Sequence, residues 1–376
     1  MAYELIPADP ESLGRALSAL EGVEELREAL GDRDAWLVGG AVRDLLLGGT
    51  RADLDLVVEE DASAVAAALG SGSKEHERFG TASVEMAGIR VDIASARRET
   101  YSGPGALPDV TPAPIRQDLA RRDFTINAMA LPLRGEAELL DPHDGKEDLA
   151  NGVLRVLHPG SFEDDPTRAL RAARYAARLG MRLEPQTAEL LAAADLGAVS
   201  ADRVDAELRR LLAEESAPEA VGLLAEWGLA GMDEGAKDRV RAARELLADP
   251  AWSGIAEAAD VMFEAARPSE ESRRAVAELT QKVPASPSAG VALASGVKPV
   301  HLVMARIAGA EWLDAWAAEW RHVSLEISGT DLLDAGIAQG PALGRGLDAA
   351  LAARLDGTIA TRDEELRVAL AAAAAT

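Results

Sequence analysis

The chain has 376 residues, of which 48% are hydrophobic, so it is long enough to form more than one domain core. It contains no cysteine, which excludes disulfides and any zinc site with cysteine ligands. Its formal net charge of −25 argues against a generally basic surface of the kind that nucleic-acid-binding proteins carry.

The N-terminal part is predicted to alternate helices and strands. Leucines at helical spacing predict one amphipathic helix over 10–30. The hairpin signal Ala87-Gly88 separates two apolar runs that read as paired strands. The predicted elements are a strand over 35–40, a helix over 41–48, a strand over 52–58, a helix over 62–70, strands over 82–86 and 89–95, and an irregular, flexible loop over 101–115.

Asp53 and Asp55 lie on the predicted strand at positions whose side chains point to the same face. Two carboxylates this close repel each other unless a cation lies between them, and oxygen ligands of this kind suit Mg²⁺. Gly39 and Gly40 precede the strand and allow the backbone to approach a phosphate, with which Arg43 can pair. A D-x-D pair alone is more often a solvated strand edge, and the glycine turn ahead of it favours the site.

Beyond residue 150 the helical period dominates, with breaks near 180–185, at Pro250 and over 284–296, the last predicted as a surface loop. One helix should begin with an acid at its cap and Pro166 at its first position, and should end before Gly180. Asp165 and Arg168 are three residues apart and so should share a face of it. Arg171 and Arg174 continue this row, and Tyr175 should turn towards the core.

The charge distribution of residues 151–220 shows how an acidic chain could still bind an anionic ligand. Residues 151–220 are nearly balanced in charge, whereas the rest of the chain holds most of the acidic excess. We therefore expect a local positive groove on an acidic body. Its clustered arginines are Arg155, Arg168, Arg171, Arg174, Arg178 and Arg182.

Ordered motifs extend this pattern along most of the chain. After the glycine turn and D-x-D come RRDFTINAMAL at 121–131, DPHDGKEDL at 141–149 and FEDDPTRALRAARYAARLG at 162–180. VSADRVDAELRRLL at 199–212 and a segment over 327–366 follow. In this order they resemble the class II tRNA nucleotidyltransferases, that is, the CCA-adding enzymes and their bacterial poly(A) polymerase relatives. The stretch over 230–320 resembles the family least.

The resemblance implies an α+β nucleotidyltransferase head of the polymerase-β type with a mixed sheet, followed by all-α neck, body and tail domains. The implied bounds are 1–150 for the head, 151–220 for the neck that recognises the base, 221–320 for the body and 321–376 for a tRNA-binding tail. The implied partners are tRNA, CTP and ATP, and the implied location is the cytoplasm. No membrane is expected to be involved, because the N-terminus has no signal-peptide features and no apolar run could cross a bilayer. A fused metal-dependent phosphohydrolase domain is not expected, because only five histidines occur.

The resemblance also implies catalytic roles. Mg²⁺ would bind Asp53 and Asp55, and Asp92 would be a third carboxylate that helps to deprotonate the attacking 3′-OH. Asp92 lies on a strand expected to pair with the D-x-D strand, and its neighbours Val91 and Ile93 argue against a lone acid that caps a turn.

The triphosphate and sugar of the nucleotide would be held by polar residues within apolar stretches. Arg122 is implied on the phosphates and Asp123 near the ribose hydroxyls, whereas Arg121 is a better candidate for a structural salt bridge. The implied nucleotide-binding set is Gly40, Arg43, Arg122, Asp123, Asn127, Asp165, Arg168, Arg171 and Arg174.

Asp165 and Arg168 would read the base. Cytosine and adenine both present an amine beside a ring acceptor nitrogen, so a carboxylate can accept from the first and a guanidinium can donate to the second. Uracil and guanine reverse this order. The alternative is an ordinary surface ion pair, which contributes little. The family usually has Glu-Asp where this chain has Asp164-Asp165, a change that affects how the pair is braced.

Other functions share parts of the pattern. A bacterial poly(A) polymerase usually has a basic C-terminal extension, a small-molecule nucleotidyltransferase needs neither the 162–180 helix nor the tail, and an inactive tRNA-binding relative should lose Asp53 or Asp55. CC-only and A-only addition are further alternatives. CC-only enzymes are altered in the loop over 101–116, which has its full length here, so full CCA addition is favoured.

Overall fold

The structure is a computed structural model that describes residues 3–50, 54–70, 74–76, 80–86 and 88–375. Asp53, one of the two predicted metal ligands, lies outside the described residues. The chain divides into two compact units, Met1–Ala230 and Gly231–Thr376. The first contains the predicted head and neck and the second contains most of the predicted body and the tail, so the division into four domains stays a prediction.

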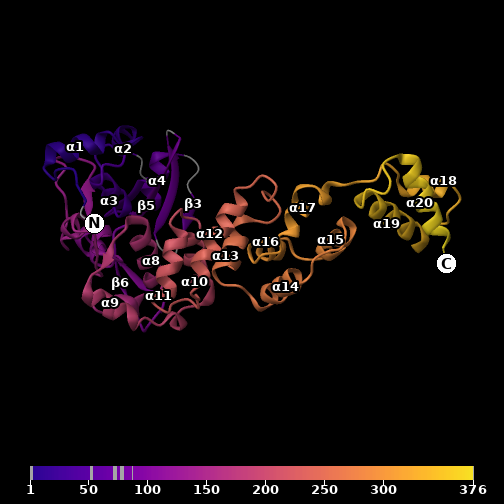
Figure 1. Ribbon diagram of the computed structural model, residues 1–376. Coiled ribbons are helices and arrows are strands. Elements are labelled where there is room, and N and C mark those ends of the chain that lie inside the picture. The colour runs from indigo at the N-terminus through magenta and orange to yellow at the C-terminus, as the bar shows by residue number, and fades with distance from the viewer. Residues whose placement is uncertain (1–2, 51–53, 71–73, 77–79, 87, 376) are drawn as a thin grey trace. The chain divides into compact units, whose positions relative to one another are not determined.

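A six-stranded mixed sheet lies within the first unit, where Figure 1 labels β3 and β5. Its strand order is β3-β4-β5-β2-β1-β8. β2 and β5 are parallel, whereas the other neighbours are antiparallel. β4 and β5 form the predicted hairpin, in which Gly88 adopts a positive φ of 81°. The strands are β1 Ala35–Val38, β2 Leu54–Val58, β3 Lys74–His76, β4 Thr81–Met86, β5 Ile89–Ser95 and β8 Ala130–Pro132.

The first predicted helix is wrong in one respect, because two helices replace it. α1 spans Pro10–Ser18 and α2 spans Val23–Leu30, and the break falls at Gly22, whose φ is +79°. Ile89 packs where a side chain at Gly22 would lie, so this glycine permits a close approach as well as the turn. The leucine period persists because both helices bury the same side, with Leu13, Leu17 and Leu26 fully buried.

Two further predictions missed short strands. Within the loop over 101–115, β7 (Asp109–Pro112) pairs with β6 (Arg97–Thr100), and Ile115 already begins α5 (Ile115–Ala120). The predicted all-α neck contains a small parallel ladder of β9 (Val153–Leu154) and β10 (Arg182–Leu183). Gly180 and Pro185 end and begin helices, and the backbone between them is free to extend and pair.

The remaining helices of the first unit carry or support the site. α8 and α11 pack against each other, and α10 packs against both. These helices are α3 Gly40–Leu46, α4 Ala62–Leu69, α6 Gly145–Ala150, α7 Ser161–Asp164, α8 Arg168–Leu179, α9 Pro185–Ala192, α10 Ala201–Leu212 and α11 Ala217–Glu226, with 3₁₀ turns at Thr125–Asn127 and Leu196–Ala198.

The second unit is helical throughout its described residues. Trp252 is its largest buried side chain, and its indole donates to Asp314 at 3.2 Å. A separate cluster of buried residues, Ile327, Leu332, Ala350 and Ala369, forms a core for the last three helices. The helices are α12 Ala236–Leu247, α13 Ala258–Ala266, α14 Glu270–Gln281, α15 Pro287–Ala294, α16 Pro299–Ile307, α17 Trp312–Ala318, α18 Gly329–Asp334, α19 Pro341–Leu355 and α20 Arg362–Ala374, with a 3₁₀ turn at Trp320–His322.

The surface loop predicted over 284–296 contains α15 instead. Ser286 caps this helix by accepting from the amide of Ala289, and Pro287 occupies its first turn, so the Pro and Ser residues act as a start signal. None of the helices in the described part of the chain has the length and apolar character of a transmembrane span.

Candidate nucleotide site

Asp55 on β2 and Asp92 on β5 are direct partners in the parallel register. Paired residues of neighbouring strands project to the same face, as the sequence predicted, and both carboxylates line one cavity of about 350 Å³. Asp92 accepts hydrogen bonds from the Ser83 hydroxyl and from Arg90 Nε. Asp92 is therefore not the cap of a turn. Two carboxylates on one face are a donor set that fits a hard divalent cation.

The glycine turn ahead of β2 lies directly against an arginine of the RRD motif. Gly39 has a φ of +66°, and a Cβ there would lie 2.8 Å from Arg122 Nη1. Arg43 on α3 is buried, with Nη1 donating to Asn127 Oδ1 at 2.7 Å and Nε donating to Asp44 Oδ1 at 2.8 Å. The glycine therefore allows two arginines from different elements to reach the same region of the site.

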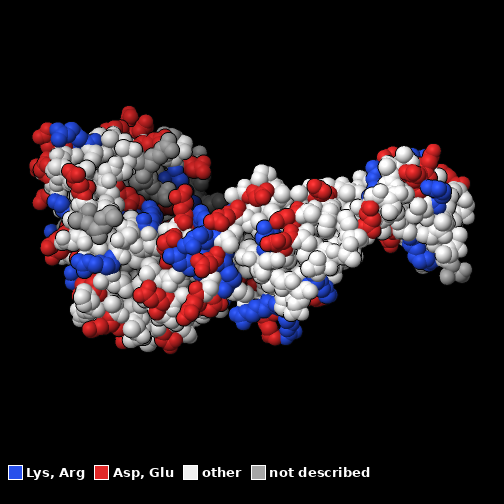
Figure 2. All heavy atoms as spheres, in the orientation of Figure 1, with Lys and Arg blue, Asp and Glu red and all other residues white. Residues whose placement is uncertain are grey.

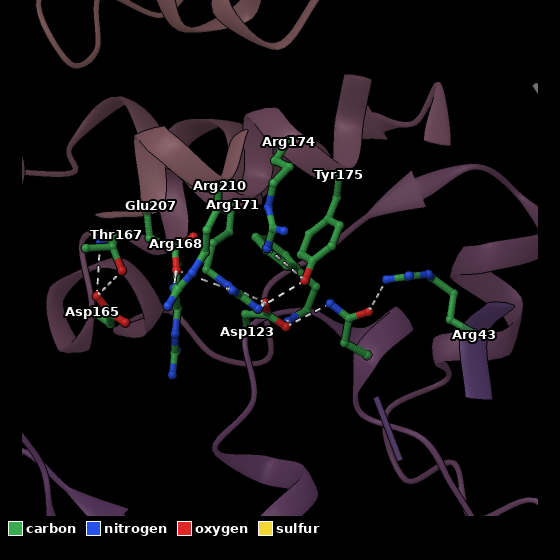
Figure 3. Close-up of polar contacts among 12 residues, drawn as sticks. Arg43, Asp123, Asp165, Thr167, Arg168, Arg171, Arg174, Tyr175, Glu207 and Arg210 are labelled. Atoms are coloured by element: carbon green, nitrogen blue, oxygen red, sulfur yellow. Dashed lines mark hydrogen bonds and ion pairs between the residues drawn. The ribbon is translucent and has the colours of Figure 1, made fainter. Parts of the chain in front are cut away.

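A buried relay of hydrogen bonds joins α3 to α8 (Figure 3). Asn127 Nδ2 donates to Asp123 Oδ1 at 3.0 Å, and Arg171 donates from Nε and Nη2 to Asp123 Oδ2 at 2.8 and 2.6 Å. With the amide of Phe124, Asp123 accepts four hydrogen bonds. These donors occupy both carboxylate oxygens, so Asp123 holds Arg171 and Asn127 in place, and its place near the ribose hydroxyls stays a prediction.

The electrostatics of Asp123 follow from this burial. Desolvation alone would raise its pKa, but the charge of Arg171 and the hydrogen bonds from Asn127 and Arg171 outweigh it and lower the pKa from 3.8 to about 2. Burial likewise disfavours the charged form of Arg171, and the carboxylate of Asp123 reverses this and raises the pKa of the guanidinium. The pair is therefore ionised at neutral pH.

Tyr175 is the centre of an arginine cluster. Its side chain is buried, as the sequence predicted, and its ring meets Phe124 edge to face at 5.9 Å. The guanidinium carbons of Arg43, Arg171 and Arg174 lie 5.3, 5.5 and 4.9 Å from its ring centroid. Cation–π attraction to one ring holds three like charges close together.

The helix predicted to begin at Pro166 begins two residues later, with α8 at Arg168. Asp165 precedes it, as expected of a capping acid, and its carboxylate accepts from the Thr167 amide at 3.0 Å and the Thr167 hydroxyl at 2.7 Å. Arg203 on α10 donates to the same Asp165 oxygen at 3.0 Å and to the carbonyl oxygen of Gly105 at 2.8 Å.

Arg168 is 5% exposed and its guanidinium is held from two sides. Nη1 donates to Ser161 Oγ at 2.6 Å, and Nη2 donates to the carbonyl oxygen of Arg121 at 2.8 Å. Among the described residues Asp165 forms its ion pair with Arg203 rather than with Arg168, yet both Asp165 and Arg168 line the same cavity. Asp164 stands where the family usually has Glu, and its Oδ2 lies 3.6 Å from His158 Nε2. Asp164 and Arg168 both line another cavity.

The shared cavity has a volume of about 580 Å³ and an excess of positive charge. Eight arginines line it against five carboxylates, as expected of a positive groove on an acidic chain. Of the six arginines predicted to form the groove, Arg155 and Arg182 line a different cavity. On the face drawn in Figure 2, acidic side chains are spread over the surface of each unit. The lining charges are Arg43, Arg121, Arg122, Arg168, Arg171, Arg174, Arg178 and Arg203 with Asp44, Asp55, Glu99, Asp123 and Asp165.

Two donors of this cluster are buried without a partner among the described residues. They are Nε of Arg122 and Nε of Arg174. Buried polar groups in proteins are almost always hydrogen-bonded, so unpaired donors at an arginine-lined cavity indicate an anionic ligand.

Sequence reasoning missed the carboxylates that hold the arginines in place. Glu207 and Glu214 flank α8, with Arg171 Nη1 lying 3.7 Å from Glu207 and Arg174 Nη1 lying 3.2 Å from Glu214. Arg203 and Glu207 are four residues apart in the neck motif, a spacing that places them on one helix face and could have indicated their role. Arg121 forms the predicted structural salt bridges with Asp118 and Glu99.

Comparison with known proteins identifies the class of protein to which this head domain is similar. Residues 35–155 match the model of the poly A polymerase head domain. An A-adding tRNA nucleotidyltransferase of Halalkalibacterium halodurans is 47% identical over 49% of this chain, and the chain spans only 46% of that relative. A solved CCA-adding enzyme in complex with CTP superposes with a TM-score of 0.77 at 26% identity, covering 99% of this chain and 100% of that one.

A longer alignment fixes the family. A CC-adding tRNA nucleotidyltransferase of Deinococcus radiodurans is 35% identical over 364 residues, which cover 92% of this chain and 91% of the relative. The chain belongs to the tRNA nucleotidyltransferase family that its motifs resemble.

Proposed function

We propose that this protein is a CCA-adding tRNA nucleotidyltransferase that uses CTP and ATP without a nucleic-acid template. The observation that carries the proposal is the cavity in which Asp165, Arg168 and the phosphate-binding arginines come together beside Asp55. A base reader, a triphosphate cluster and a catalytic carboxylate in one cavity are what nucleotide addition needs. The relatives and the CTP-bound neighbour support the substrates.

Each group has a role in the proposed reaction. Arg43, Arg122, Arg171 and Arg174 bind the triphosphate or sugar, and Asp165 with Arg168 accepts cytosine and adenine. Mg²⁺ bound by Asp53 and Asp55, with Asp92 beside them, would lower the pKa of the tRNA 3′-OH and neutralise charge on the departing pyrophosphate. The 3′-OH attacks the α-phosphate, the bond to the β-phosphate oxygen breaks, and pyrophosphate leaves.

The cavity concentrates positive charge, whereas basic and acidic side chains are interspersed on the second unit (Figure 2), so the second unit would hold tRNA by shape and a limited number of phosphate contacts. The tail over 321–376 is the proposed tRNA-binding domain. The protein is proposed to act in the cytoplasm.

A second candidate is CC addition alone, because the relative that aligns over 91% of its length is a CC-adding enzyme. Against it, the segment over 101–116 has its full length, and Gly105 within it is held by hydrogen bonds to Glu163 and Arg203. A head shared with A-adding relatives also favours an enzyme that can use ATP.

The test supplies one tRNA that ends at the discriminator base with CTP alone, ATP alone or both, and the same tRNA ending in CC with ATP. Full CCA addition predicts two added nucleotides with CTP, none with ATP alone, three with both, and one on the CC-ending tRNA. Products that stop at CC under every condition would establish CC addition. An A tract longer than one residue would establish a poly(A) polymerase.

A further inference from the structure

The carboxylate of Asp118 lies between two neighbouring arginines of the nucleotide cavity. Asp118 is on α5, its side chain is fully buried, and the cavity does not reach it. Oδ1 accepts from Arg121 Nε at 2.9 Å and Nη2 at 2.7 Å, and from the amide of Arg97 at 3.3 Å. Oδ2 accepts from Arg122 Nη2 at 3.0 Å. One carboxylate thus uses both oxygens to fix consecutive arginines.

The two arginines lead to opposite ends of the site. Arg122 packs against Gly39, lines both the arginine cavity and the cavity of Asp55 and Asp92, and keeps a buried, unpaired Nε. The direction of its side chain is set by the contact with Asp118, the only ion pair that Arg122 forms among the described residues.

Arg121 acts through its backbone instead. Its carbonyl oxygen accepts from Arg168 Nη2 at 2.8 Å, so the base-reading guanidinium rests on the main chain of Arg121. The Arg121 side chain is anchored by Asp118 and, at 3.0 Å, by Glu99. Glu99 in turn accepts from the Tyr101 hydroxyl at 2.8 Å, and both side chains line the cavity.

The environment of Asp118 keeps it charged. Burial would raise its pKa, but the opposing charges of Arg121 and Arg122 hold the pKa below its ordinary value. A neutral side chain of the same size at this position could accept from only one of the two arginines, since an amide has one acceptor oxygen.

We propose that Asp118 is a positioning residue that couples the triphosphate end of the site, through Arg122, to the base-reading end, through Arg121 and Arg168. It touches neither nucleotide nor metal. The inference rests on the proposed function and adds to it that substrate affinity and base selection depend on one buried carboxylate.

The test compares Asp118→Asn with the unchanged protein in single-nucleotide incorporation on one tRNA with each of the four NTPs. We expect KM for CTP and ATP to rise about tenfold or more, and the kcat/KM ratio of CTP to UTP to fall by a similar factor, the effect of one lost charged hydrogen bond at each end. Asp148→Asn is the matched control, because it also removes a buried carboxylate that pairs with an arginine, Arg155. It should lower the melting temperature comparably and leave the CTP to UTP ratio unchanged.

Two results would overturn the inference. A rise in KM without any change in the CTP to UTP ratio would limit Asp118 to holding Arg122. If the kcat/KM ratio of CTP to UTP were the same in the Asp118→Asn and Asp148→Asn variants, both carboxylates would have a structural role only. Failure of the unchanged protein to incorporate CTP or ATP would refute the proposed function itself, which keeps the two failures distinct.

A second variant covers the case in which Asp118→Asn does not fold. Arg121→Ala removes the side-chain anchor of the Arg121 backbone but leaves the Asp118–Arg122 pair. We expect selectivity against UTP to fall at least tenfold while KM for CTP changes less than threefold, on the scale of one charged hydrogen bond. Unchanged selectivity in this variant would also refute the coupling.

Discussion

Replacing Asp123 by Asn tests the buried relay most directly. The substitution keeps the size of the side chain but removes the charge that faces Arg171 and puts an NH₂ group where two donors point. Among the described residues Arg171 would then keep only one anionic partner, Glu207, whose Oε1 lies 3.7 Å from Arg171 Nη1. We expect the first unit to lose stability and the arginines of the cavity to lose their fixed arrangement.

The magnitude follows from the pKa of Asp123. A carboxyl whose pKa falls from 3.8 in the unfolded chain to about 2 in the folded protein stabilises the fold by about 2.4 kcal/mol at neutral pH. Because the folded pKa is the lower one, this contribution is fully present above pH 3.8 and is lost as the pH falls towards 2. The wild-type and variant free energies of unfolding should therefore converge in acid.

The measurement is urea unfolding at pH values from 7 to 3. Unfolding is monitored by hydrogen exchange of peptides from residues 3–230, so that the signal reports the first unit and not the second. Asp109→Asn, which removes an exposed carboxylate on β7, is the control and should change stability by less than about 0.5 kcal/mol. A wild-type advantage over Asp123→Asn that stays constant down to pH 3, or that is absent at pH 7, would refute the relay as a source of stability.

Three further results are expected. Asp55→Ala should abolish nucleotide incorporation and leave the circular dichroism spectrum intact, because it removes a metal ligand and an anion from one sheet face; normal incorporation would exclude the metal site. Arg168→Ala should lose about 1.5–3 kcal/mol of discrimination against UTP and GTP, roughly ten- to a hundredfold, whereas Arg171→Ala should weaken all NTPs alike; four NTPs slowed in proportion by Arg168→Ala would show that it does not read the base. Gly145→Ala should lower the free energy of unfolding by about 1–3 kcal/mol, because its Cβ would lie 2.1 Å from a backbone oxygen of the 3₁₀ turn; an unchanged melting temperature would contradict this packing.

Local patterns predicted the elements that local physics determines. The hairpin of β4 and β5 follows from strand period and turn chemistry. The meeting of Asp55 with Asp92 also needs the long-range parallel pairing of β2 with β5, which local patterns do not determine. The break at Gly22 did not, because the leucine period continues across it and only the approach of Ile89, a residue distant in sequence, makes the turn necessary.

The site was predictable as a set of residues but not as a set of contacts. Arg168 and Asp165 carry a recognisable motif, yet the contact of Asp165 with Arg203 on α10 depends on tertiary packing and not on that motif. The supporting carboxylate Asp118 lies outside the motifs, whereas Glu207 lies within the 199–212 motif, four residues from Arg203, without a role assigned from the sequence. Their partners are fixed by tertiary packing, which a single sequence does not specify.

The carboxylates that hold the arginine side chains have an entropic consequence. A free arginine on a protein surface samples many rotamers, and immobilising one rotamer-rich side chain on binding costs about 0.5–1.5 kcal/mol. In this cavity Arg43, Arg122, Arg171 and Arg174 already have fixed partners before any nucleotide arrives. Folding already fixes the rotamers of these side chains. A triphosphate bound in the proposed site would therefore lose less of its binding free energy to ordering the protein.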